Sequence, residues 1–542
     1  MSGHEAIDEL LAEAGVDGLR LRGALALLSG GRWWTLGDLV RETATSRRTI
    51  ESLLRVLPLE HSGDRVRIPS DQVNRYNVSI VTDISGLGNP VAGMVAEHSA
   101  TLERLETLIA GAPRGRHALD HVSATAETVL RRALLLGRRF WLPGARLLCV
   151  GDHDLTSLAV RMIHPEAEVA VADVDDRILE YIDAQDLGVR TRWTDLRLGL
   201  PPSLRGWADL AITDPPYTPE GIGLFAARAA EGLRDRDRGR ILVAYGASER
   251  TPMLALKVQK ALFDLNLLNE AIFPHFNRYH GAEAIGSAAD LYVLRPTTKT
   301  WPAIAARLDR LATAIYTQGP QSVESAPAAP PDEAAVTAFG PDLLAGDWPR
   351  GLLPQVPRTR LATLLAKPYA ADPERVAIAL PAGLEAALPR LLLATRARHV
   401  RVLTAGPVAD TVADLPELAD LLAPVYRLTA APSEAGHALD AVRLSPPDGG
   451  PDRVVRRIMD SAHGKVANTW REALTEPGAT GSAGAAGPAG PAGAAGAAGL
   501  TKRQARAAVE EAAPWALDAT LLELPLHRLA WMRARIDAPS PA

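Results

Sequence analysis

The sequence predicts an α/β protein built around a doubly wound, mostly parallel sheet of seven strands. Strands and helices alternate from about residue 145 to residue 296, as in parallel sheets with helical crossovers. The last two strands follow each other closely, as an antiparallel pair at the sheet edge requires. Polar loops follow the first and fourth strands, at the edge where open α/β sheets bind their ligands.

Length and composition limit the possible functions. The chain has 542 residues, which corresponds to about three or four domains. A net charge of −5 gives no reason to expect a nucleic-acid partner. The apolar runs are short and the first residues lack a basic start, so we expect a cytoplasmic protein with no membrane partner. The single cysteine, Cys149, excludes an internal disulfide and a cysteine zinc site, and we interpret it as core packing.

Residues 1–85 show the helix, helix, helix, strand-pair pattern of a winged-helix-like domain. These elements are expected at Leu19–Leu28, from Thr35 with Asp38 three residues later, at Arg47–Leu57 capped by Thr45 and Ser46, and at Arg65–Ile68. DNA binding would use Arg47, Arg48 and Arg55. Neighbouring acidic residues dilute these charges, which favours packing or dimerisation. We therefore expect a homodimer.

Residues 86–140 predict a helical connector, and residues 141–317 the catalytic domain. The arginines at the end of the connector are interpreted as a solvated helix face: Arg131, Arg132, Arg138 and Arg139. The seven strands are expected at Arg146–Val150, Glu168–Ala172, Arg190–Trp193, Leu210–Thr213, Arg240–Ala244, Asn269–Phe273 and Asp290–Leu294. The intervening helices include Leu155–Ile163, Asp176–Asp183, Glu220–Leu233 and Pro252–Leu265.

The remaining sequence has no motif with recognisable chemistry. Residues 318–340 are rich in Pro, Ser and Ala and predict a linker. Residues 341–475 predict a further α/β region of unknown role, with strands Arg375–Leu380 and His399–Leu403. Residues 476–500 are rich in Gly, Ala and Pro, which predicts a disordered linker. A helical segment is expected over residues 501–542.

The loop after the first strand carries Gly151, Asp152, His153 and Asp154. The glycine allows a tight turn after the strand. Anionic side chains at such a turn repel a pyrophosphate, which disfavours NAD, FAD and ATP. The loop instead suits a ligand that bears positive charge.

Further acids end the next two strands. Asp173 lies 22 positions after Gly151, where a carboxylate accepts hydrogen bonds from ribose hydroxyls. Asp175 and Asp176 are nearby alternatives, and we expect one of them to cap the following helix. Asp195 is either an acceptor for an adenine amino group or a turn residue. Together these residues predict an adenosine group over the sheet edge.

The loop after the fourth strand reads Asp214, Pro215, Pro216 and Tyr217. The prolines fix the backbone and remove N–H donors, so carbonyl groups and the Asp214 carboxylate can face the cavity. Such acceptors stabilise the charge on an amine as it is alkylated, and they can take its proton. The Tyr217 ring can pack against a sulfonium or ammonium group. A rigid structural turn is the alternative interpretation.

Three motifs together resemble the branched-chain polyamine synthase family, over roughly Leu19 to Pro296. They are Gly151-Asp152-His153-Asp154-Leu155-Thr156-Ser157, Thr213-Asp214-Pro215-Pro216-Tyr217-Thr218 and Gly281-Ala282-Glu283-Ala284-Ile285-Gly286-Ser287. The resemblance implies a methyltransferase-like catalytic fold behind a winged-helix-like domain. It also implies transfer of an aminopropyl group from decarboxylated S-adenosylmethionine to a polyamine, with release of methylthioadenosine.

The resemblance gives Asp154 the role of the key acid at the secondary amine, with Asp214 and Tyr217 from the second motif. Donor contacts are expected from Gly151, Asp152, Asp173, Asp175 and Asp195. Polyamine contacts are expected from His153, Pro215, Pro216, Glu283 and Asp290. The chain departs from the family where His153 replaces an aspartate, which leaves open the acceptor and the number of groups added. No metal site is expected.

Charge supports the decarboxylated donor independently. S-adenosylmethionine carries a carboxylate, which Asp152 and Asp154 would repel by several kcal/mol relative to the decarboxylated form. Two other functions stay open. One is an amino-group methyltransferase, with nucleic acid as one possible substrate, because Asp-Pro-Pro-Tyr loops also occur in such enzymes. The other is a non-enzymatic regulator that binds DNA and senses a polyamine.

Overall fold

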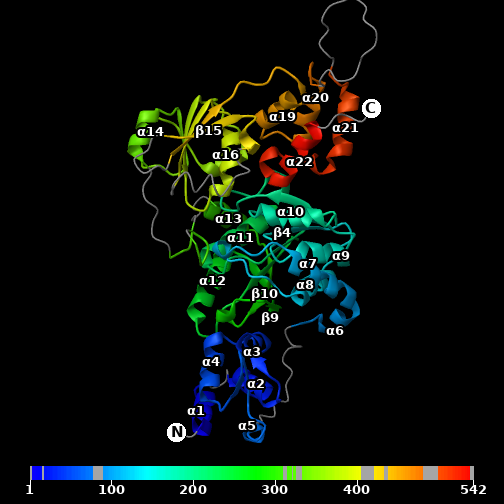
Figure 1. Cartoon of the computed structure of the whole chain (residues 1–542), viewed down its shortest axis with the longest axis vertical. Helices are drawn as coiled ribbons and strands as arrows, with labels where there is room; N and C mark the ends of the chain where they lie inside the picture. The colour runs from blue at the N-terminus through cyan, green and yellow to red at the C-terminus, as the bar shows by residue number, and fades with distance from the viewer. Residues whose placement is uncertain are drawn as a thin grey trace, which may run out of the picture. The chain divides into compact units, whose positions relative to one another are not determined.

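The computed structural model in Figure 1 describes residues 3–14, 18–76, 89–308, 314–319, 321–324, 332–404, 420–431, 438–479 and 499–537. The chain divides into two compact units. The first comprises Met1–Ala170, Gln185–Val189 and Ala208–Val323, and the second comprises Val171–Ala184, Arg190–Trp207 and Glu324–Ala542.

The N-terminal part of the first unit contains helices and a small antiparallel sheet, drawn in blue in Figure 1. The helices are α1 (Gly3–Ala14), α2 (Gly18–Ser29), α3 (Leu36–Thr43), α4 (Arg47–Val56) and α5 (Val73–Tyr76). The strands are β1 (Trp34–Thr35), β2 (Glu60–Ser62) and β3 (Arg65–Arg67), in the order β1-β3-β2. The Thr35 side chain accepts a hydrogen bond from the backbone N–H of Asp38. Ser46 takes the N-cap position of α4 but makes no side-chain cap bond. The predicted helices and strand are confirmed.

The connector is helical, as predicted, but its basic residues differ in burial. Its elements are α6 (Ala92–Val95), η3 (Ala96–His98), α7 (Ser99–Gly111), η4 (His117–Leu119) and α8 (Ala126–Arg139). Arg138 and Arg139 are exposed at the end of α8. Arg132 is only 2% exposed, so its placement on a solvated face was wrong. Its helix position faces the sheet, where carboxylates compensate its charge.

The large sheet has the order β6-β5-β4-β7-β8-β10-β9. Its strands are β4 (Arg146–Val150), β5 (Glu168–Asp173), β6 (Arg190–Trp193), β7 (Leu210–Thr213), β8 (Arg240–Tyr245), β9 (Leu268–Arg278) and β10 (Ala288–Arg295). Strand β7 runs parallel to β4 and β8, and β10 runs antiparallel to β8 and β9. All seven predicted strands are confirmed, and the antiparallel edge pair is present. The fold is therefore mixed α/β, with a seven-stranded sheet that ends in an antiparallel pair.

The helices that follow these strands also lie where they were predicted. They are α9 (Thr156–Ile163), α10 (Asp176–Ala184), α11 (Pro219–Gly232) and α12 (Pro252–Asp264). A further helix, α13 (Thr300–Leu308), was not predicted. Cys149 is fully buried in β4, which confirms that it packs in the core. No helix among the described residues is both long and apolar enough to span a bilayer.

The second unit contains a six-stranded sheet in the order β12-β11-β13-β14-β16-β15. Its strands are β11 (Leu343–Ala345), β12 (Arg358–Thr359), β13 (Arg375–Leu380), β14 (His399–Thr404), β15 (Tyr426–Ala430) and β16 (Ala438–Arg443). Its helices are α14 (Glu333–Phe339), α15 (Leu361–Ala366), α16 (Leu388–Thr395), α19 (Gly450–Asp460), α20 (Val466–Thr475), α21 (Lys502–Ala512) and α22 (Leu526–Asp537). The two predicted strands and the helical C-terminal segment are confirmed.

Two predicted linkers are described only in part. Residues 320 and 325–331 of the first linker lie outside the described residues, and α14 occupies its later part. Residues 480–498, most of the Gly-, Ala- and Pro-rich segment, also lie outside them.

Candidate active site

A buried arginine joins the two motifs at the carboxyl ends of β4 and β7. Arg132 donates from Nη1 to Asp154 Oδ2 at 2.9 Å and from Nη2 to Asp214 Oδ2 at 2.5 Å. The Arg132 side chain is 2% exposed and that of Asp154 8%. When both carboxylates are ionised, this group of three has a formal charge of −1. The acidic edge predicted from the sequence is thus half neutralised by a cation from α8.

Two tyrosine hydroxyls complete the surroundings of Asp214. Tyr217 donates to Oδ1 at 3.0 Å, and Tyr279, just after β9, donates to Oδ2 at 2.7 Å. Burial raises the pKa of both phenols, and the charge of Asp214 raises each further, so both remain protonated donors. The Tyr217 ring packs edge-on against Tyr245, with 5.4 Å between the centroids.

Asp214 has an unusual protonation equilibrium. Burial raises the pKa of its carboxyl to about 6, although the Arg132 charge opposes this shift, and the nearby Asp154 charge adds to it. Pro215 and Pro216 follow it and are buried. A carboxyl with a pKa near the working pH can both hold and release a proton.

The remaining contacts fix Arg132 and Asp154 in place. The backbone N–H of Ala124 donates to Asp154 Oδ1 at 2.9 Å, and Arg132 Nε donates to Asn277 Oδ1 at 2.8 Å. Arg132, Asn277 and Tyr279 contact this group, but no individual role in the site was predicted for them from the sequence. Asn277 and Tyr279 lie in the polar segment before the last strand, but no local pattern distinguishes them from their neighbours.

The first loop is shaped by two residues with positive φ. Gly151 has a φ of 72°, and Leu155, which has a Cβ, has a φ of 62°. The Asp152 carboxylate accepts from the backbone N–H of Ser157 at 3.1 Å, so it helps to cap α9. The His153 ring stacks on His121, with 4.4 Å between centroids and 14° between planes. Backbone strain of this kind is concentrated at functional sites.

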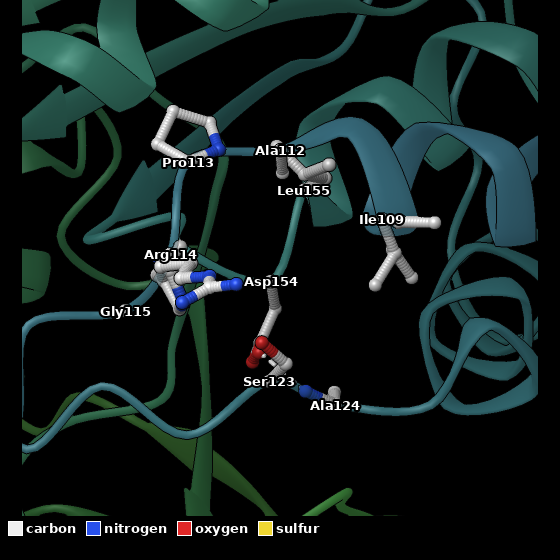
Figure 2. Close-up of a pocket in the computed structure, with 11 residues that line it drawn as sticks. Ile109, Ala112, Pro113, Arg114, Gly115, Ser123, Ala124, Asp154 and Leu155 are labelled. Carbon is white, nitrogen blue, oxygen red and sulfur yellow. Dashed lines mark hydrogen bonds between the residues drawn. The ribbon is translucent and has the colours of Figure 1, made fainter.

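A cavity of about 230 Å³ borders this cluster (Figure 2). Its lining includes Arg114, Ser123, His153, Asp154 and the apolar side chain of Leu155. The wall therefore combines a carboxylate, a guanidinium and an imidazole with apolar surface. Of the two network carboxylates, it is Asp154 that lines the cavity.

The acids predicted to contact the nucleoside lie in the second unit, at the ends of β5 and β6. Asp173 Oδ1 accepts from the backbone N–H of Asp175 at 2.8 Å. The Asp175 carboxylate accepts from the backbone N–H of Arg177 at 3.2 Å, which confirms that one acid caps α10. Arg197 donates from Nε and Nη2 to the two oxygens of Asp195, at 2.8 and 2.5 Å.

The two acids predicted to contact the polyamine have protein partners. Glu283 forms an ion pair with Arg47 of α4. Asp290 Oδ1 accepts from the backbone N–H of His275 at 2.8 Å. Among the described residues, no three His, Cys, Asp or Glu side chains gather as a metal site would require.

Known proteins match the central part of the chain. Residues 100–322 match a family model described as the branched-chain polyamine synthase A C-terminal domain. An uncharacterized protein of Methanocaldococcus jannaschii is 38% identical over 174 residues, which are 31% of this chain and 43% of that protein. The N(4)-bis(aminopropyl)spermidine synthase of the same organism is 30% identical over 186 residues, which are 33% of this chain and 52% of that enzyme. The matches thus span about half the length of these curated relatives.

Among solved structures, a branched-chain polyamine synthase mutein from Thermus thermophilus, in complex with N4-aminopropylspermidine and 5'-methylthioadenosine, is similar to this chain. It is 20% identical, and the match covers 54% of this chain and 92% of that one with a TM-score of 0.40.

Proposed function

We propose that this chain, whose residues 100–322 match the branched-chain polyamine synthase A C-terminal domain, transfers an aminopropyl group from decarboxylated S-adenosylmethionine to an amine of a polyamine. Methylthioadenosine is the second product. The similarity to enzymes named N(4)-bis(aminopropyl)spermidine synthase supports this reaction. The structural observation that carries it is the pair Asp154 and Asp214, held by one buried arginine beside a cavity.

The reaction needs an amine with a free electron pair and an acceptor for its proton. The neutral nitrogen attacks the propyl carbon next to sulfur, the carbon–sulfur bond breaks, and its electrons leave with methylthioadenosine. Asp154 lines the cavity, so it is placed to accept a hydrogen bond from the amine and then its proton. Asp214, which accepts hydrogen bonds from Arg132 and the Tyr217 hydroxyl, adds negative charge to this group and so stabilises the developing ammonium charge.

The remaining residues predicted from the sequence are assigned to the donor or the acceptor by their positions in the fold. Strand-end residues Gly151, Asp152, Asp173, Asp175 and Asp195 are assigned to the donor, as expected at this edge of an α/β sheet. Those assigned to the acceptor are His153, Pro215, Pro216, Glu283 and Asp290.

The N-terminal helices and strands are proposed to be a winged-helix-like domain that serves packing rather than DNA binding. Arg47 of α4 pairs with Glu283 and also with Glu51 of its own helix. Thr49 Oγ1 donates to Glu249 at 2.7 Å. Arg47, one of the three arginines that would face a phosphate backbone, is thus already paired within the first unit.

The change Asp154→Asn tests the proposal. We expect turnover to fall at least a hundredfold, because the amide cannot take the proton, while methylthioadenosine still binds. Product masses and isothermal titration measure the two effects. The exposed Asp237→Asn serves as the control and should keep full activity. Normal turnover by the Asp154 variant would refute the assignment.

A second candidate is an amino-group methyltransferase that uses S-adenosylmethionine itself. Arg114 borders the cavity and offers a cation that could accept a donor carboxylate. Titration of the protein with both donors separates the two functions. Tighter binding of the carboxylated donor, with methyl transfer to an amine, would favour this candidate.

A further inference from the structure

The sheets of the two units share an unusual strand pattern. The first contains β4-β7-β8-β10-β9 and the second β11-β13-β14-β16-β15. In each series the first three strands are parallel, and the fourth runs antiparallel to both the third and the fifth. In each sheet the strand that comes last in the chain lies between two earlier strands rather than at the sheet edge. This strand is β10 in the first sheet and β16 in the second. The same arrangement twice in one chain indicates a structural repeat.

The loops after the first strand of each series also correspond. Gly151 follows β4 with a φ of 72°, and Gly346 follows β11 with a φ of 98°. An aspartate follows each glycine in the sequence. With these glycines aligned, Pro349 takes the position of Asp154.

Strand pairing extends the comparison to the second motif. Cys149 lies opposite Ile212 in the first sheet, and Ala345 lies opposite Ile378 in the second. When Gly151 and Gly346 are aligned, these pairs also align β7 with β13. Counting residues onward from the aligned strands, Pro381 corresponds to Pro216. Ala379 then takes the position of Asp214, and Ala382 that of Tyr217. The second series therefore lacks counterparts of Asp154, Asp214 and Tyr217, although Asp347 corresponds to Asp152.

Apolar packing occupies the corresponding region of the second sheet. Trp348, at the position of His153, is 8% exposed and packs in a cluster with Leu344 and Leu403. Ala379 packs against the same cluster. A Cβ on Gly346 would lie 2.6 Å from the Ala379 carbonyl oxygen, so the backbones approach closely there. These groups cannot hold an amine or take its proton.

The second series contacts the acids at the ends of β5 and β6, and all of these residues lie in the second unit. Arg197 clamps Asp195 and also donates from Nη2 to the carbonyl of Gly383 at 2.8 Å. Gly383 lies in the loop after β13, which corresponds to the Asp214 loop. In the first sheet the corresponding loop carries the proposed reacting groups. In the second sheet this loop contacts Arg197, which holds the donor-site candidate Asp195.

Arg390 of α16 makes a second connection of this kind. It is 1% exposed, and its guanidinium carbon lies 3.7 Å from the centroid of Trp193, the last residue of β6. Its Nη2 donates to the Leu524 carbonyl at 2.8 Å and lies 3.3 Å from Asp176 Oδ1. Cation–π stacking and desolvated hydrogen bonds make this a fixed contact rather than a surface ion pair.

We propose that the second sheet is a catalytically silent copy of the transferase sheet, and that it positions Asp195 for the nucleoside part of the donor through Arg197 and Arg390. The identity of the ligand rests on the proposed function. Arg197 and Arg390 are positioning residues, because they act through Asp195 and Trp193.

Titration of the full chain with methylthioadenosine tests the silent copy. We expect one site per chain, and no change in affinity or stoichiometry on Asp347→Asn. Two equivalent sites per chain, or a loss of one site in that variant, would overturn the proposal. Absence of any binding would overturn the positioning role as well.

The change Arg197→Lys tests the positioning role, because it keeps the charge but loses the two-pronged clamp. We expect the KM for the donor and the Kd for methylthioadenosine to rise about tenfold, one order of magnitude being about 1.4 kcal/mol of binding free energy. The kcat should stay within a factor of two. Arg427→Met, on an exposed side chain of β15, is the control.

Arg390→Lys and Arg390→Met provide the second pair of variants. The lysine should recover part of the donor affinity that the methionine loses, with circular dichroism confirming that both fold. Unchanged methylthioadenosine affinity in folded Arg197 and Arg390 variants would refute positioning. If affinity weakens as expected but no polyamine is alkylated, the positioning role stands and the proposed function fails.

Discussion

At the scale of single residues, Arg132 organises the site from outside the two motifs. It joins Asp154 and Asp214, and its own position is fixed by Asn277. Buried ion pairs of this kind are costly to break, because the remaining charges stay desolvated. The integrity of the site therefore depends on a helix that precedes the sheet.

The change Arg132→Met should be strongly destabilising. It leaves two buried carboxylates without their cation, which costs about 3–5 kcal/mol. Urea unfolding measures this loss, and Arg138→Met, on an exposed side chain of the same helix, should change stability by less than about 0.5 kcal/mol. Equal effects of the two changes would contradict the buried network.

Asp214 should make stability depend on pH. Its folded pKa of about 6 lies above the unfolded value, so its favourable contribution is present in acid and lost as pH rises through 6. Asp214→Asn mimics the protonated form. Between pH 4 and 7.5 the wild type should lose on the order of 2 kcal/mol relative to this variant, as measured by urea unfolding. Parallel pH profiles would show that Asp214 titrates normally.

The same carboxyl should set an acidic limb in the rate. Since the ionised form stabilises the ammonium, kcat should fall as pH drops below about 6. In Asp214→Asn this limb should disappear, at a lower overall rate. Steady-state kinetics across pH 5–8 provide the measurement, and an unchanged limb in the variant would assign the titration to another group.

The sequence identified only part of this cluster. Asp154, Asp214 and Tyr217 stand in recognisable motifs after strands, so their position at the sheet edge was predictable. Arg132 was predicted as solvated, since helix charges usually are, and its partners come from loops far away in the chain. Tyr279 reaches Asp214 through the fold of β9, which no local pattern encodes.

At the scale of elements, a helix N-cap fixes the loop that carries Asp214 and Tyr217. Thr218 follows Tyr217 directly, and its side chain accepts from the backbone N–H of Gly221 at the start of α11. The same hydroxyl donates to the Ile315 carbonyl at 2.6 Å. Thr218 thus fixes both the start of α11 and the end of the Asp214–Tyr217 loop.

The change Thr218→Ala should cost about 1–2 kcal/mol of stability, because an N-cap and a buried hydrogen bond are lost. Thermal unfolding measures this loss. Thr107→Ala, an exposed position in α7, provides the control and should lie within about 0.5 kcal/mol of the wild type. A Thr218 variant as stable as this control would show that the cap contributes little.

Element prediction succeeded where strands are apolar and flanked by helices. Strands β4, β7 and β8 were found because buried parallel strands have nearly continuous apolar runs. In the second unit, β11 and β12 have only three and two residues, too short for a periodic signal. The proposed repeat could not be predicted from the sequence, because the loops of the second sheet lack the motif residues of the first. It is visible only in strand order and register.

At the scale of the whole molecule, charge separates the proposed function from the nucleic-acid alternatives. A net charge of −5 offers little attraction to phosphates, and Arg47 is engaged in ion pairs. We expect no binding to a 20-base-pair duplex at micromolar protein in 150 mM salt, as measured by fluorescence anisotropy. Submicromolar affinity that weakens with salt would favour the methyltransferase or the regulator.

Arg132 also affects which form of a substrate is admitted. Polyamines are ionised in water, yet only a nitrogen with an unshared electron pair can attack. The Arg132 guanidinium keeps its proton at every accessible pH and offsets one of the two carboxylates, so the group stabilises a cationic amine less than Asp154 and Asp214 alone would. If the proposed function holds, the site would hold the amine's proton less tightly than two unpaired carboxylates would, which makes loss of that proton before the attack easier.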